Sequence, residues 1–114
     1  GAVGFVQMPE NSRESYFEGG KASALAWVEA TRLNLGFHPV SPSTFIFNRY
    51  VHKNKEVQFE PFKEELAELR NKFMSILNLQ SDSGEIFLFR LFNGSPIATK
   101  SLRRDLDLHY KYLN

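Results

Sequence analysis

Apolar residues between Pro61 and Leu79 recur at alternating steps of four and three along the chain. They are Phe62, Leu66, Leu69, Phe73 and Ile76. This spacing places all of them on one face of an α-helix, and the positions between them are largely charged. Pro61 suits the first helical position, because its missing N–H would have no intrahelical partner there. The segment is therefore predicted to be an amphipathic helix that covers a hydrophobic surface.

An alanine-rich segment from Lys21 to Leu35 predicts a second helix that closes at Gly36. One broad side of its helical wheel carries Ala24, Leu25, Trp27, Val28, Thr31 and Leu35. The other side carries Ala22, Ala26, Ala30 and Leu33. This second side is either simply exposed, as alanine in a helix often is, or forms a dimer contact. Upstream, Ser12 is a candidate cap for a short helical turn, which the double glycine at 19–20 is expected to break.

Five segments are predicted strands, because they are β-branched and aromatic or alternate between apolar and polar residues. They are residues 2–6, 44–51, 56–59, 85–92 and 97–100. The second and third are expected to form a hairpin whose turn spans 52–55. Segment 85–92 is apolar on both faces, which indicates an interior position in the sheet. Asn93-Gly94 predicts a tight turn into the last strand, and 37–43, with two prolines, is predicted to be a loop.

The predicted order is β, α, β, β, α, β, β and a tail. Its first six elements follow the βαββαβ order of the ferredoxin-like plan, in which two helices cover one face of an antiparallel sheet. Residues 102–113 fit either a strand or a helix capped by Ser101, and we expect a short helical tail after the C-terminal strand. The fold class is thus α+β, with residues 1–114 as a single domain. The uncovered face of the sheet is where a ligand, a nucleic acid or a second subunit is expected.

Composition narrows the function classes. Eleven phenylalanines in 114 residues are more rings than one sheet and two helices require, which favours an aromatic interface or pocket. A net charge of +1 argues against a global attraction to nucleic acid or anionic membranes. The chain has no cysteine, which excludes disulfides, thiolate metal sites and a cysteine nucleophile. No apolar run approaches the roughly 20 residues of a membrane helix, and no signal peptide is visible, so we expect a cytoplasmic protein without a membrane partner.

The predicted hairpin carries the most suggestive candidate binding site. Its members are Phe47, Arg49, Tyr50, His52, Lys53 and Lys55. Positive groups beside exposed rings suit single-stranded nucleic acid, with charge for phosphates and rings for bases. The same positive groups suit a small anionic ligand. The alternative is a solvated hairpin tip whose lysines keep it from pairing with another sheet edge.

Other clusters carry weaker signals. Asp105, Asp107 and His109 would share a strand face but lack the spacing of known metal ligands. The segment Gly19-Gly20-Lys21 lacks the spacing of a phosphate-binding loop, and no serine or carboxylate pair has the context of a catalytic group. A second basic group is better explained by pairing within the chain; it comprises Arg90, Lys100, Arg103, Arg104 and Lys111. We therefore predict no catalytic residue, no metal and no cofactor.

Two hypotheses of different classes follow. The first is a non-catalytic binding or interaction domain that works as a homodimer through its free sheet face or an aromatic-lined pocket. The second is a nucleic-acid-binding or regulatory domain that uses the basic aromatic hairpin of residues 45–55.

Overall fold

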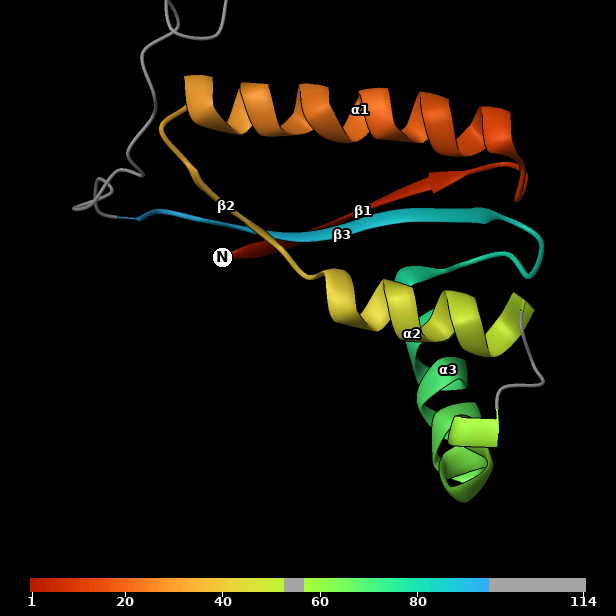
Figure 1. Ribbon diagram of the computed structural model, residues 1–114. Helices are drawn as coiled ribbons and strands as arrows, with labels where there is room; N and C mark the ends of the chain where they lie inside the picture. Colours follow the sequence, from red (N-terminus) through yellow and green to blue (C-terminus); the bar gives the residue numbers. More distant parts are fainter. Residues whose placement is uncertain (53–56, 95–114) are drawn as a thin grey trace, which may run out of the picture.

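The computed structural model describes residues 1–52 and 57–94 (Figure 1). Its elements are β1 (Ala2–Met8), α1 (Arg13–Arg32), β2 (Gly36–Pro39), α2 (Ser41–His52), the 3-10 helix η1 (Val57–Phe62), α3 (Lys63–Leu77) and β3 (Gly84–Phe92). Within the described residues the three strands form an antiparallel sheet in the order β1-β3-β2. The fold is therefore mixed α+β. The predicted strand 97–100 and helical tail 102–113 lie outside the described residues.

The central strand is β3, as its two apolar faces predicted. It pairs with β1 from Ala2↔Leu91 to Met8↔Gly84, with a bulge at Val6/Gln7. On its other edge it pairs with β2 from Gly36↔Phe92 to Pro39↔Phe89. The predictions of a first strand and of an interior strand at 85–92 are confirmed.

Helix α1 is longer than predicted. Its N-cap is Ser12, whose hydroxyl oxygen accepts a 3.1 Å hydrogen bond from the Ser15 N–H, so the predicted cap is confirmed. The expected break at Gly19-Gly20 is wrong, because Gly19 is buried against Ile86, where a side chain on the helix would collide. This close approach to the sheet offsets the weak helix propensity of glycine. The helix ends at Arg32, and Asn34 at φ 56° rather than Gly36 turns the chain into β2.

The predicted strand at 44–51 is wrong, since these residues belong to helix α2. The deciding signal is Ser41-Pro42, because proline in a first turn favours a helix start. The two most buried residues, Thr44 and Phe47, are three apart, as on one helix face. The expected returning strand is also wrong, because Val57–Phe62 forms η1. With the hairpin lost, the ferredoxin-like order is not seen within the described residues, and the predicted loop at 37–43 is replaced by β2 and the start of α2.

The helices lie on opposite faces of the sheet, with α1 on one side and α2 and α3 on the other (Figure 1). On the α1 side, Trp27 stacks on Phe37 at 4.8 Å between ring centroids, and Phe37 stacks on Phe89 at 4.5 Å. On the other side, Phe73 of α3 meets Phe5 of β1 at 5.9 Å. The expectation of two helices on one face is therefore wrong. Because β3 is apolar on both faces, each face requires its own cover.

The prediction of an amphipathic helix near 61–79 is confirmed by α3, which ends at Asn78 in the left-handed conformation. The face of α3 that packs on the rest of the protein is rotated about the helix axis from the predicted face. Leu66 and Phe73 are partly buried, whereas the predicted Ile76 is 81% exposed. The most buried residue of the helix is Arg70, whose partner on β3 determines the rotation of the helix.

Candidate functional site

The first candidate site is the side of α1 that points away from the sheet, which we call the outer face of α1. Small residues of α1 pack on the sheet; they are Gly19, Ser23, Ala26 and Ala30. The larger side chains are turned outward, and Phe17, Leu25 and Val28 are 69%, 69% and 66% exposed. The sequence left the side with Ala22, Ala26, Ala30 and Leu33 either exposed or in a dimer contact. Ala26 and Ala30 instead face the sheet, whereas Ala22 and Leu33 are exposed.

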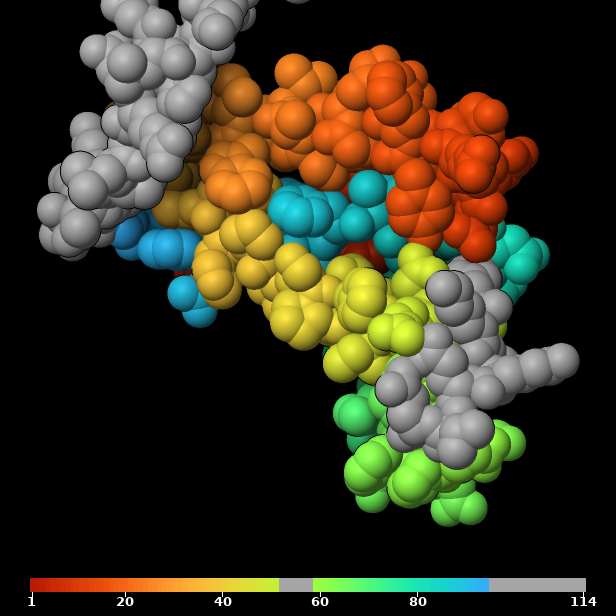
Figure 2. All heavy atoms as spheres, viewed as in Figure 1, coloured from red at the N-terminus to blue at the C-terminus, as the bar shows by residue number. Residues whose placement is uncertain are grey.

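Among the residues that the structure describes, no further element covers the outer face of α1. In Figure 2 the atoms of α1 form the top edge of the described part of the molecule. A shallow apolar groove of about 350 Å³ follows the helix between Ala24, Trp27, Val28 and Thr31. A contiguous apolar surface on a helix is typical of a protein interaction site.

Two ion pairs border the apolar centre of the outer face of α1. Lys21 contacts Glu18 at 2.8 Å before it, and Arg32 contacts Glu29 at 2.6 Å after it. Hydrogen bonds from Arg32 hold the pKa of the Glu29 carboxyl below its ordinary value. Both pairs are solvent-exposed, so each contributes little to folding on its own.

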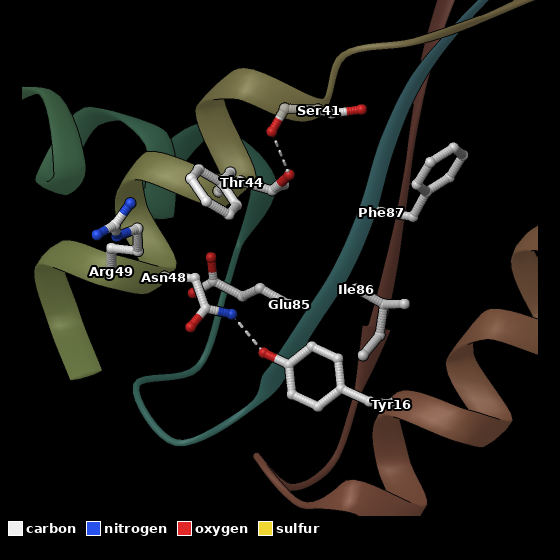
Figure 3. Close-up of a pocket in the computed structure, with 9 residues that line it drawn as sticks. Tyr16, Ser41, Thr44, Asn48, Arg49, Glu85, Ile86 and Phe87 are labelled. Atoms are coloured by element: carbon white, nitrogen blue, oxygen red, sulfur yellow. Dashed lines mark hydrogen bonds between the residues drawn. The ribbon is translucent and has the colours of Figure 1, made fainter. Parts of the chain in front are cut away.

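The second candidate site is a pocket of about 470 Å³ between the start of α1, α2 and the first half of β3. It is lined by Tyr16, Ser41, Thr44, Phe45, Asn48, Arg49, Glu85, Ile86 and Phe87. The pocket exists because β2 pairs with β3 only as far as Phe89, so that α2 flanks the rest of this edge of β3. Figure 3 shows Tyr16 and Asn48 turned toward each other across the opening, where the Asn48 amide donates a hydrogen bond to the Tyr16 hydroxyl oxygen.

The carboxylate that lines this pocket, Glu85, already has an ion-pair partner. Glu85 forms a two-pronged ion pair with Arg70 of α3, with side-chain exposures of 8% and 7%. The Arg70 guanidinium also lies over the rings of Phe47 and Phe73, at 5.6 Å and 6.0 Å from their centroids. The carboxylate is thus held by a fixed cation, which suits a structural role better than proton transfer.

The residues of the predicted hairpin site lie in several different environments. Phe47 is 8% exposed and packs on Phe73, so its ring cannot stack on a base. Arg49 lines the pocket and lies over the Phe45 ring at 5.4 Å. Tyr50 meets Phe59 edge-on at 6.5 Å. His52 is the last residue of α2, and Lys53 and Lys55 lie outside the described residues.

The helical conformation of α2 explains this distribution. Phe47 and Tyr50 are three residues apart and lie on one side, whereas Arg49 lies with Phe45, four residues before it, on the pocket side. The described members of the predicted site therefore do not form one surface. The sequence analysis did not predict that Tyr16, Asn48 and Glu85 are neighbours. The helix-start signal at Ser41-Pro42 could have indicated it, because Asn48 faces the other two residues from helix α2.

Comparisons with known proteins add no identification. No protein-family model matches the chain, and no curated protein or solved structure shows significant similarity to it. None of the helices within residues 1–52 and 57–94 is both long enough and apolar enough to span a bilayer. The same residues contain no group of three or more histidine, aspartate or glutamate side chains placed to hold a metal ion.

Proposed function

We propose that the chain is a non-catalytic interaction domain that works as a homodimer through the outer face of α1. The observation that supports this proposal is the outward orientation of Phe17, Leu25 and Val28 on one long helix. Burying an exposed leucine or valine side chain is worth about 1.5–3 kcal/mol, so leaving three large apolar groups in water is costly unless a partner covers them.

The size of the surface sets the expected affinity. A helix of 20 residues is about 30 Å long, and one such helix laid against another gives an interface near the lower end of the range for stable complexes, about 1,200 Å². We therefore expect dissociation in the micromolar range. The proposed working surface is thus a helix, whereas the sequence suggested the free face of the sheet or an aromatic-lined pocket.

The test is light scattering coupled to size-exclusion chromatography, with loading from about 1 µM to about 500 µM so as to bracket a micromolar dissociation constant. The wild type is expected to move from monomer to dimer over this range. The double variant Leu25→Ser/Val28→Ser should stay monomeric, because it removes the apolar centre and leaves the sheet-facing side of α1 unchanged. A wild type that remains monomeric throughout would refute the proposal.

The matched control is Ile76→Ser, because Ile76 is also an exposed apolar residue on a helix, at a site remote from α1. It should dimerise as the wild type does. If it weakens the dimer as much as the double variant, the interface does not lie on α1. Far-UV circular dichroism of all three proteins checks that the fold is retained.

A further inference from the structure

The register of the strands places Arg90 on the face of the sheet away from α1. Phe89 belongs to the α1 face, because it stacks on Phe37, which in turn stacks on Trp27 of α1. Neighbouring residues of a strand point to opposite faces. Arg90 therefore lies on the other face, and so does Phe92, two positions further along β3.

Side chains from all three strands meet around Arg90. His38 of β2 and Val3 of β1 are its register partners, and residues opposite one another in a sheet share a face, with Cβ atoms about 5 Å apart. The guanidinium carbon of Arg90 lies 4.9 Å from the centroid of the Phe92 ring. That ring lies over its own register partner, Gly36, which has no side chain. We call Val3, His38, Arg90 and Phe92 the Arg90 patch.

No described element covers the Arg90 patch. On this face, α2 and α3 lie under the end of the sheet near Gly84 (Figure 1), where Phe73 of α3 meets Phe5. At the other end Val3 is 65% exposed, His38 and Arg90 are exposed too, and Phe92 is half-buried. The patch is thus an accessible surface on the side of the sheet opposite to α1.

The Arg90 patch holds two basic side chains directly opposite each other on neighbouring strands. Within residues 1–52 and 57–94, neither Arg90 nor His38 forms an ion pair with an acid. His38 donates a hydrogen bond whether or not it is protonated, and it adds a second positive charge when it is. Two basic groups side by side without an acid form a local attraction for anions, which the net charge of +1 does not reveal.

We infer that the Arg90 patch binds single-stranded nucleic acid. Arg90 and His38 supply donors for phosphate, and the Phe92 ring with the guanidinium plane supplies a surface on which an unpaired base stacks. A small ligand needs a concave site that encloses it, whereas an extended strand of nucleotides lies across a flat sheet. The sequence analysis placed nucleic-acid binding on residues 45–55, and the inference moves it to the sheet.

The inference is independent of the proposed dimer, because the Arg90 patch and the outer face of α1 lie on opposite sides of the sheet. Few phosphate contacts imply weak binding, with a dissociation constant of about 100 µM or below at low salt. Two contacts also predict that the logarithm of the binding constant falls with the logarithm of the salt concentration with a slope of about −1.4.

The experiment is fluorescence polarisation of a labelled oligothymidylate and a labelled oligouridylate, titrated with the full chain at several salt concentrations. Arg90→Gln should weaken binding at least fivefold and make the salt slope shallower by about 0.7, because one phosphate contact is lost. Phe92→Leu should weaken binding at least fivefold and leave the slope unchanged, because it removes a stacking surface and no charge. A duplex oligonucleotide should bind more weakly than either single strand, since its bases are not free to stack on the ring.

The matched control is Arg13→Gln, which makes the same change of charge at an exposed arginine of α1. It should bind as the wild type does, and circular dichroism of every variant checks that the fold is retained. The variant Leu25→Ser/Val28→Ser should also bind as the wild-type subunit does, so a failure of the proposed dimer leaves this test intact.

Three results would overturn the inference. The first is no binding of either single strand at low salt. The second is an Arg90→Gln protein that binds as well as Arg13→Gln, which also covers the case in which another part of the chain binds the oligonucleotide or covers the patch. The third is a Phe92→Leu protein with unchanged affinity, or a duplex bound as tightly as the single strands, because the patch would then attract anions without recognising unpaired bases.

Discussion

The Arg70–Glu85 ion pair offers the sharpest test of how the fold is held together. Both side chains are more than nine-tenths buried, and the pair joins α3 to the central strand. Removing the acid by Glu85→Gln leaves the Arg70 charge over the Phe47 and Phe73 rings with no carboxylate. Breaking a buried ion pair in this way costs about 3–5 kcal/mol of the free energy of unfolding, because the remaining charge is desolvated and unpaired. This is a large part of the roughly 5–15 kcal/mol that a domain of this kind has.

Removing both charges is expected to cost less than removing the acid alone. In Arg70→Met/Glu85→Gln the buried cation is replaced by a flexible apolar chain that fits beside two aromatic rings. The wild-type pair is also incompletely satisfied, since the buried Arg70 Nε has no hydrogen-bond partner. With Arg70→Met as the second single variant, the double-mutant cycle should give a coupling of about 2–3 kcal/mol, at the upper end of the range for contacting residues.

The assay is urea unfolding followed by the fluorescence of Trp27, the single tryptophan, and by circular dichroism. Because Trp27 lies on the opposite face of the sheet, coincident transitions would show that the two layers unfold together. The control is Glu68→Gln, which breaks the exposed Glu68–Lys72 pair and should change stability by less than about 1 kcal/mol. If Glu85→Gln costs no more than this control, or the cycle shows no coupling, the ion pair does not hold α3 on the sheet.

Two further predictions concern α1. Gly20→Ala should stabilise the protein by about 0.5–1 kcal/mol, because no atom lies within 4 Å of the added Cβ. Gly19→Ala should destabilise it by about 1–3 kcal/mol, because its Cβ meets Ile86. Equal effects of the two substitutions in urea unfolding would contradict the packing of α1. Since hydrogen bonds from Arg32 depress the pKa of the Glu29 carboxyl, the contribution of this pair to stability should be present above the ordinary carboxyl pKa and lost as pH falls through the depressed value. A carboxyl NMR titration in which Arg32→Ala leaves the pKa of Glu29 unchanged would contradict this.

The sequence predicts those elements in which one periodicity dominates. The four-and-three spacing at 62–76 gives α3, and the two-sided apolar run at 85–92 gives the central strand, because neither pattern fits the other conformation. It fails at 44–51, where Phe45, Ile46 and Phe47 in succession fit a strand and a buried helix equally well. There the boundary residues Ser41-Pro42 determine the outcome. The rotation of α3 also escapes periodicity, because the anchor on its inner face is the charged Arg70, which counts as polar in any apolar pattern.

The orientation of α1 could not be predicted from the helix itself, because it depends on the volume that the sheet leaves. The sheet face under α1 carries Phe37, Phe87 and Phe89, whose rings lie within 6.0 Å of one another by centroid. A close-packed interior leaves little room above these rings, so apart from Trp27, which stacks on Phe37, α1 contributes small residues toward the sheet, such as Gly19 and Ala30. The large side of α1 is then turned outward by the packing below it. A side chain such as Leu25 is accordingly exposed for a geometric reason.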